Sequence, residues 1–112
     1  MNKKEFLKIL DKAGAERLRI RLIIGNGKLQ DLVIQYETLI NEKWIVIVRY
    51  DLEHGFFHRD LMTPKGEKIK TVIEMPDLRT AATYAEQDIK DKWEFYKEKY
   101  LKQIRNDKQR NH

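Results

Sequence analysis

The residues best suited to chemistry lie together in the stretch 49–60, which reads RYDLEHGFFHRD. It holds two of the three histidines of the chain, with two arginines and three acidic residues. If the stretch forms a β-hairpin in which Asp51 pairs with Phe56, four side chains project from one face of the sheet: Arg49, Asp51, His58 and Asp60. Cross-strand neighbours lie about 5 Å apart and diagonal neighbours about 7–8 Å. The spacing therefore predicts a compact group of these four side chains.

Such a group suits acid–base chemistry on a phosphate. A histidine with a pKa near neutrality donates or accepts protons, and a nearby carboxylate orients it or acts as its partner. Arginine binds phosphate through parallel hydrogen bonds and stabilises charge that develops on it. We therefore predict a metal-independent, ribonuclease-like site without a cofactor, in which His58 is the general acid or base and Asp51 its partner. Arg49 and Arg59 are expected to bind the phosphate, with Asp60 beside them.

Further positive and polar side chains are predicted to extend this site and to bind RNA. Three lysines follow the hairpin directly, and three arginines alternate along an earlier strand, so both sets offer positive charge to an anionic ligand. The predicted binding residues are His54, Tyr50, Lys65, Lys68, Lys70, Arg17, Arg19 and Arg21.

Two other interpretations of the hairpin stay open. In the first, Asp51 accepts turn N–H groups, Gly55 supplies a positive φ, and the remaining charges form ordinary cross-strand ion pairs. In the second, two histidines and two carboxylates bind a metal ion. That set would be His54, His58, Asp51 and Asp60. Because His-x3-His spacing places two ligands on one face of a helix, and this segment is predicted as strand and turn, no metal is expected.

The elements that position these residues follow from hydrophobic periodicity. Alternation of apolar and polar residues predicts five strands, at 17–24, 29–40, 44–51, 56–62 and 68–74. Tight turns separate them, including the hairpin signal Gly25-Asn26-Gly27, which favours an antiparallel meander. A short amphipathic helix is predicted at 2–12 and a long helix from Asp77 to Arg105. The fold class is therefore α+β, in one domain spanning 1–112, with a frayed basic tail at about 106–112.

The long helix carries an apolar stripe that short strands cannot cover. At 1.5 Å per residue the helix is about 43 Å long, whereas strands of six to eight residues span about 20–26 Å. The distal part of the stripe consists of Trp93, Tyr96 and Tyr100. It is expected to form a homodimer interface or to pack beneath the N-terminal helix. An alternative function is therefore a non-enzymatic homodimeric interaction module, or one half of a protein pair.

Composition excludes several classes of protein. The 112 residues include no cysteine and no serine, which excludes disulfides, cysteine zinc sites, and serine or cysteine nucleophiles. The net charge is +5 and arises mostly from residues 90–112, which favours an anionic partner. No window resembles a signal peptide or holds the roughly 20 apolar residues of a membrane span. A cytoplasmic protein without membrane contact is expected.

The hairpin sequence also carries a resemblance. RYDLEHGFFHRD, then Pro64, Gly66 and the segment 68–70, then YAEQDIKDKWEFY, resemble a family of small uncharacterised prokaryotic proteins over roughly the last two-thirds of the chain. More loosely, the hairpin is similar to the TumE-type toxins of bacterial toxin–antitoxin pairs. The corresponding positions are Tyr50, Asp51, Glu53, Gly55, His58 and Arg59. Here the spacing from Asp51 to His58 is shorter, and Asp60 replaces a second histidine. The resemblance implies a ribonuclease-like or translation-directed toxin.

Overall fold

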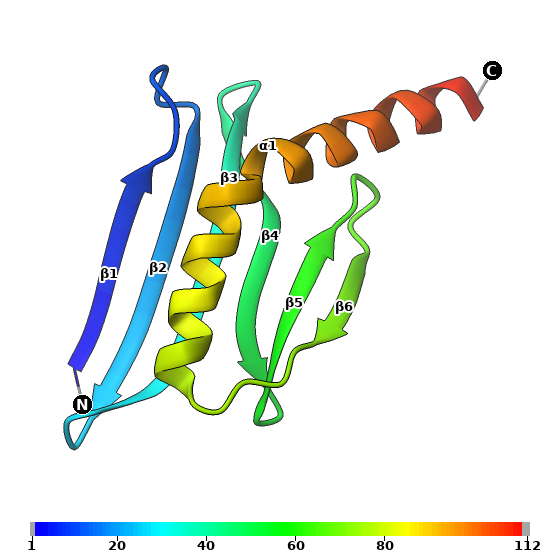
Figure 1. Cartoon of the computed structure of the whole chain (residues 1–112). Helices are drawn as coiled ribbons and strands as arrows, with labels where there is room; N and C mark the ends of the chain where they lie inside the picture. Colours follow the sequence, from blue (N-terminus) through cyan, green and yellow to red (C-terminus); the bar gives the residue numbers. More distant parts are fainter. Residues whose placement is uncertain (1, 111–112) are drawn as a thin grey trace.

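A computed structural model describes residues 2–110 and has one sheet with one long helix packed across it (Figure 1). The strands are β1 (Asn2–Ile9), β2 (Glu16–Gly25), β3 (Lys28–Ile40), β4 (Lys43–Glu53), β5 (Phe56–Met62) and β6 (Lys68–Val72), and the helix is α1 (Leu78–Arg110). Each strand pairs antiparallel with the next, in the order β1-β2-β3-β4-β5-β6. The α+β class and the antiparallel meander are confirmed, but the sheet has six strands and not five.

Two-residue turns connect the central strands. Asn26 and Gly27 join β2 to β3, and both have positive φ angles, of 53° and 73°. Asn41 and Glu42 do the same between β3 and β4, with φ angles of 50° and 66°. Positive φ at both central positions is the geometry of the type I′ turn, whose twist matches that of antiparallel strands. The turns predicted at these two places are therefore confirmed.

The predicted N-terminal helix is wrong, because residues 2–9 form the edge strand β1. All eight residues of β1 pair with β2, from Asn2 opposite Ile24 to Ile9 opposite Arg17. An isolated helix of this length is marginal in water, whereas the edge of β2 offers a ladder of backbone hydrogen bonds. Asp11 shapes the connection, since its carboxylate accepts the N–H groups of Ala15 and Glu16 at 3.0 and 3.1 Å.

The long C-terminal helix is confirmed and begins at its expected N-cap. The Asp77 carboxylate accepts the Thr80 N–H at 2.7 Å, which satisfies a backbone donor of the first turn. The helix runs through residues 106–110, while positions 111–112 of the predicted tail lie outside the described residues. In Figure 1 the helix changes direction near its middle, and its red end projects beyond β4, β5 and β6. No helix of the described chain is long and apolar enough to cross a bilayer.

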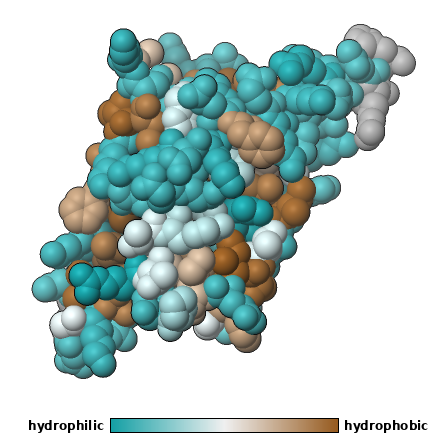
Figure 2. Space-filling view, viewed as in Figure 1, coloured by the Kyte–Doolittle hydropathy of each residue, from teal (hydrophilic) through white to brown (hydrophobic). Residues whose placement is uncertain are grey.

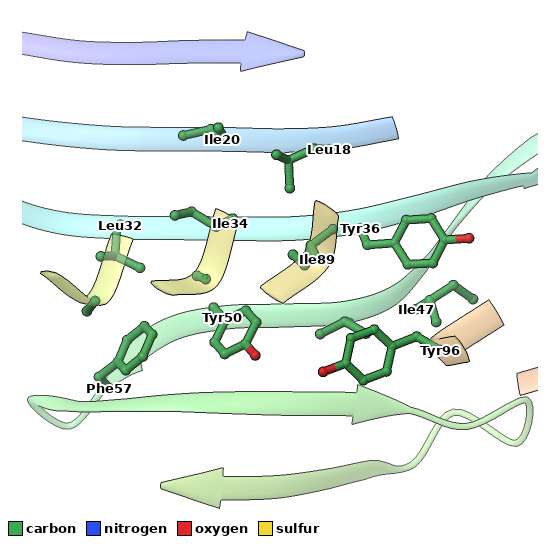
Figure 3. Close-up of a cluster of buried hydrophobic side chains, with 13 residues drawn as sticks. Leu18, Ile20, Leu32, Ile34, Tyr36, Ile47, Tyr50, Phe57, Ile89 and Tyr96 are labelled. Carbon is green, nitrogen blue, oxygen red and sulfur yellow. The ribbon is translucent and has the colours of Figure 1, made fainter. Parts of the chain in front are cut away.

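The core lies between α1 and the face of the sheet beneath it (Figure 3). Ala81 and Ala85 have no exposed surface, and their small side chains let the helix approach the sheet closely. Their neighbours in the core include Leu18, Ile20, Leu32, Ile34, Tyr36, Tyr50, Phe57, Ile89 and Tyr96. Figure 2 shows the outer side of the helix as mainly hydrophilic, with hydrophobic atoms along its flanks.

Two polar contacts are buried under the helix. Asp88 accepts hydrogen bonds from the hydroxyls of Tyr50 and Tyr96, both at 2.5 Å. Glu16, itself 2% exposed, accepts the Tyr36 hydroxyl at 2.6 Å and the Lys97 ammonium at 2.6 Å. Burial and the contact with Asp88 raise the pKa of Tyr96 to about 12. The bonds from Tyr50 to Asp88 and from Lys97 to Glu16 join α1 to the sheet at fixed positions.

The residues predicted as a dimer interface pack against the chain's own sheet. Tyr96 is 5% exposed, and Trp93 and Tyr100 are partly buried against the core. The Trp93 ring lies 6.1 Å from that of Tyr36, between centroids. The strands are longer than expected, with 13 residues in β3 and 11 in β4, so the sheet reaches farther along the helix. Homodimer formation stays a prediction.

Candidate functional site

Most of the predicted site residues lie on the face of the sheet that α1 leaves uncovered, which we call the open face. It is turned away from the viewer in Figure 1. Strand pairing aligns its side chains in two neighbouring rows. The first row is Arg19, Gln35, Arg49, Asp60 and Lys70. The second row is Arg21, Val33, Asp51, His58 and Val72.

The β4–β5 hairpin brings the predicted group together in a different register. The strands are joined by His54 and Gly55 alone, so Asp51 pairs with His58 and Arg49 with Asp60. The assumed pairing of Asp51 with Phe56 is therefore off by two residues. Because side chains alternate with a period of two, a shift of two leaves all four on one face. The observed register places Asp51 and His58 directly opposite each other.

Asp51, His58 and Asp60 form a tight group, which we call the acid–histidine cluster. The His58 Nε2 atom lies 2.6 Å from Asp51 Oδ1 and 3.3 Å from Asp60 Oδ2. The other ring nitrogen, Nδ1, lies 3.2 Å from the carbonyl oxygen of Phe56. A third carboxylate approaches from the end of β4, with Glu53 Oε2 at 3.6 Å from Nε2. The Nε2 atom thus lies within 4.0 Å of three carboxylates.

The cluster is buried although it lies on the open face. His58 and Asp60 are each 1% exposed, whereas the Asp51 side chain is 24% exposed. Burial raises the pKa of Asp51 above its ordinary value, and the neighbouring charge of Asp60 adds to this. Three of its polar atoms have no hydrogen-bond partner among the described residues: Asp51 Oδ1, His58 Nε2 and Asp60 Oδ1. Only Asp51 is accessible from solvent.

An ion pair borders the cluster on the β6 side. Lys70, which pairs with Asp60 across the strands, binds Glu53 with Nζ at 2.5 Å from Oε2. This contact lowers the pKa of Glu53. Lys68 pairs with Met62 farther along β6 and lies on the same face. Lys65 lies in the preceding turn, with its Nζ atom 4.0 Å from Asp107 of α1, away from the cluster.

The three arginines of β2 lie on the open face, and each is bonded to an acidic residue. Arg17 and Arg19 donate to the two oxygens of Glu37, at 2.6 and 3.0 Å. Arg21 donates to Glu5 of β1 at 2.8 Å. Burial alone would raise the pKa of Glu37, but hydrogen bonds from Arg17, Gln35 and Arg19 lower it below its ordinary value. The positive charge of these arginines is thus partly compensated in place.

Arg49 differs from them because its guanidinium bonds a neutral group. Its Nε atom donates to Gln35 Oε1 at 3.0 Å, and within residues 2–110 no carboxylate oxygen lies within 4.0 Å of its nitrogens. It borders an open hollow of about 430 Å³ that also exposes Arg19, Arg21 and Asp51. Val33, Gln35 and Glu37 also line it. The hollow therefore places a guanidinium that makes no ion pair within residues 2–110 beside the one exposed member of the acid–histidine cluster.

The comparisons with known proteins assign a family to the chain. A family model described as "Domain of unknown function (DUF7718)" matches residues 1–106. The chain belongs to this family. No curated protein and no solved structure matches it. This agrees with the expected family of uncharacterised proteins and gives no support to the resemblance to TumE-type toxins.

Several residues that were predicted for the site lie outside the acid–histidine cluster and the hollow. Tyr50 and Arg59 project to the helix side, where Tyr50 is fully buried and Arg59 approaches the Tyr96 hydroxyl at 3.4 Å. His54 occupies the hairpin turn with an 85% exposed side chain, 3.8 Å from Glu53. It lies outside the acid–histidine cluster. Of the two predicted phosphate-binding arginines, only Arg49 faces the hollow.

The residues assigned to the site from the sequence did not include Gln35, Glu37 and Glu53, although Glu53 is one of the positions of the toxin resemblance. Gln35 and Glu37 alternate with the core residues Ile34 and Tyr36 along β3, so the period of two places them on the open face. That alternation was a usable signal. Gln35 accepts a hydrogen bond from Arg49 of β4, and Glu37 accepts from two arginines of β2. These contacts depended on the strand register, which the pattern alone does not supply.

Proposed function

We propose that the open face binds RNA through its phosphate groups and that the acid–histidine cluster acts on the bound strand. The observation that carries the proposal is the Arg49 guanidinium, which makes no ion pair within residues 2–110, at a hollow that Asp51 also lines. Arginine binds phosphate oxygens through a planar set of donors. A phosphate bound at Arg49 would therefore lie next to the Asp51 carboxylate, which is the member of the cluster that can reach the bound strand.

The other two arginines of the hollow are pre-positioned rather than free. Arg19 is held by Glu37 and Arg21 by Glu5, so their side chains lose little further freedom when a ligand binds. Each still has donor groups beyond its bonded Nε atom. Binding is therefore expected to depend most on Arg49, with smaller contributions from Arg19 and Arg21.

In this proposal Asp51 is the residue that reacts with the bound RNA strand. His58 is almost fully buried, so its ring does not reach a ribose or phosphate directly. Asp51 touches His58 at one oxygen and faces the hollow. The proposal therefore moves the reacting group from His58 to Asp51 and treats His58 and Asp60 as positioning residues.

The test is binding and cleavage of a fluorescein-labelled single-stranded RNA, followed by anisotropy at several salt concentrations and on denaturing gels. Arg49→Gln is expected to weaken binding about tenfold or more, the loss of one charge-assisted contact. It is also expected to reduce the slope of log K against log[salt] by about 0.7, the value for one phosphate on a single strand. Asp51→Asn is expected to abolish any cleavage and to leave binding largely unchanged.

The matched control is Arg105→Gln, which removes the same charge from an exposed position on α1. If the phosphate site is at the hollow, this variant binds like the wild type. Equal losses for Arg49→Gln and Arg105→Gln would mean a diffuse charge effect and would reject the site. Absence of RNA binding by the wild type at low salt would reject the function.

A further inference from the structure

The acid–histidine cluster has the arrangement of a set of metal ligands. Each of Asp51, His58 and Asp60 offers one ligand atom, and the three atoms lie within 4.8 Å of one another. Neighbouring ligand atoms around an ion bound at about 2.1 Å are separated by roughly 3 Å. The separations of His58 Nε2 from the two carboxylates, 2.6 and 3.3 Å, lie on either side of that value.

The bonding of these atoms is the second observation. His58 Nε2 and Asp60 Oδ1 belong to residues that are 1% exposed, and neither atom has a hydrogen-bond partner within residues 2–110. Although Asp51 Oδ1 is close to Nε2, the two groups are not aligned as donor and acceptor. Buried polar atoms are rarely left unpaired in proteins, and such exceptions require an explanation.

We propose that Asp51, His58 and Asp60 bind one divalent transition-metal ion, such as Mn²⁺ or Zn²⁺. Two carboxylates and a neutral imidazole carry two negative charges, which a divalent cation compensates where water is excluded. Imidazole nitrogen suits Zn²⁺ and carboxylate oxygens suit Mn²⁺, whereas Mg²⁺ and Ca²⁺ prefer sites made only of oxygen ligands. From the sequence alone no metal was expected, and the alternative set that it left open also included His54. That residue lies in the exposed turn and is not part of the proposed ligand set.

Two features border the cluster and bear on further ligands. On the β6 side Lys70 and Glu53 pair with each other, and both side chains stay partly exposed. Asp51 opens onto the hollow that Arg49 borders. Water or an oxygen of a bound anion can complete the coordination from there. Metal binding stands on the cluster alone, and only the use of the ion on a phosphate rests on the function proposed above.

A metal-free arrangement is the competing possibility. A protonated His58 ring between Asp51 and Asp60 also balances part of their charge. In that case the folded chain needs no ion, and added metal has no effect on its stability. The two arrangements therefore make opposite predictions for purified protein stripped with EDTA and dialysed.

The experiment is calorimetric titration of the stripped protein with MnCl₂, ZnCl₂ and MgCl₂, together with thermal unfolding. We expect one equivalent of Mn²⁺ or Zn²⁺ per chain and weak or no binding of Mg²⁺. An ion present at a hundred times its Kd is expected to raise Tm by about 10 °C for a chain of this size. Asp51→Asn and His58→Gln are expected to abolish both effects, with circular dichroism confirming that each variant folds.

Glu5→Gln is the control, because it removes an acidic side chain from the same face outside the cluster. It is expected to bind metal like the wild type. No binding by the wild type at millimolar metal, or equal binding by Asp51→Asn, overturns the inference. Metal binding without RNA binding leaves the inference intact and rejects the proposed function. RNA binding without metal binding overturns the inference and leaves the proposed function intact.

Discussion

Replacing Tyr50 by phenylalanine removes one hydrogen bond from a buried carboxylate and leaves the ring in place. The hydroxyls of Tyr50 and Tyr96 both donate to the same oxygen of Asp88, each at 2.5 Å. The Asp88 side chain is 5% exposed, and its other oxygen is 3.5 Å from the exposed Lys92 ammonium. Water therefore has little access to replace a lost donor.

The expected cost follows from these contacts. A hydrogen bond to a charged group contributes about 1.5–3 kcal/mol. With an unfolding entropy of about 2.1 cal/mol/K per residue, 1 kcal/mol corresponds to about 4 °C for a chain of 112 residues. Tyr50→Phe is thus expected to lower Tm by about 6–12 °C. Tyr96→Phe should cost a similar amount, because its hydroxyl serves the same oxygen.

The assay is thermal and urea unfolding of both single variants and the double variant. The double variant leaves Asp88 without a tyrosine donor, so its loss of stability should exceed the sum of the single losses. Tyr100→Phe is the control, since burial alone raises the pKa of that tyrosine and no hydrogen bond is involved. Single losses below about 0.5 kcal/mol, or additive losses in the double variant, would refute the view that the two hydroxyls jointly satisfy the carboxylate.

Three further outcomes are expected. Val33→Phe places a larger side chain in the lining of the hollow without changing charge. It should weaken RNA binding about tenfold, equivalent to about 1.4 kcal/mol, while leaving Tm nearly unchanged, as measured by anisotropy and thermal unfolding. The pKa of Glu37 is lowered in the folded state, so its contribution to stability is present above about pH 4.5 and is lost as pH falls through the folded pKa. The free energy of unfolding, measured with urea between pH 2 and 7, should therefore depend less steeply on pH for Glu37→Gln than for the wild type. The pKa of Tyr96 is raised to about 12, so its contribution is present below about pH 10 and is lost between about pH 10 and 12. Absorbance at 295 nm should show that this tyrosine ionises at a higher pH than an ordinary tyrosine. The free energy of unfolding of Tyr96→Phe should depend less steeply on pH over that range.

The faces of the strands could be read from the sequence because alternation does not depend on exact register. Arg17, Arg19 and Arg21 alternate with Leu18 and Ile20, and the two sets lie on opposite faces as the pattern requires. The grouping of Arg49, Asp51, His58 and Asp60 tolerated a register that differed by two residues for the same reason. Polar and apolar positions within a strand are thus predictable even when its partners are not.

Contacts made by distant segments were not predictable in this way. Residues 2–9 fit a short helical stripe as well as a strand, and pairing with β2 decides between them. His58 is opposite Asp51 on β4 and Val72 on β6, and only the strand register identifies these neighbours. Arg59 was assigned to the phosphate site by its place beside His58 in sequence, although adjacent residues of a strand face opposite sides.

The position of α1 in the chain has a consequence for synthesis. All six strands precede the helix that covers their apolar face. At about 5–20 residues per second, a ribosome needs about 2–7 s to add the 33 residues of α1. During that interval the side chains of Leu18, Ile34 and Phe57 have no helix above them. A nascent chain that stalls before Leu78 is therefore expected to aggregate or to be held by chaperones.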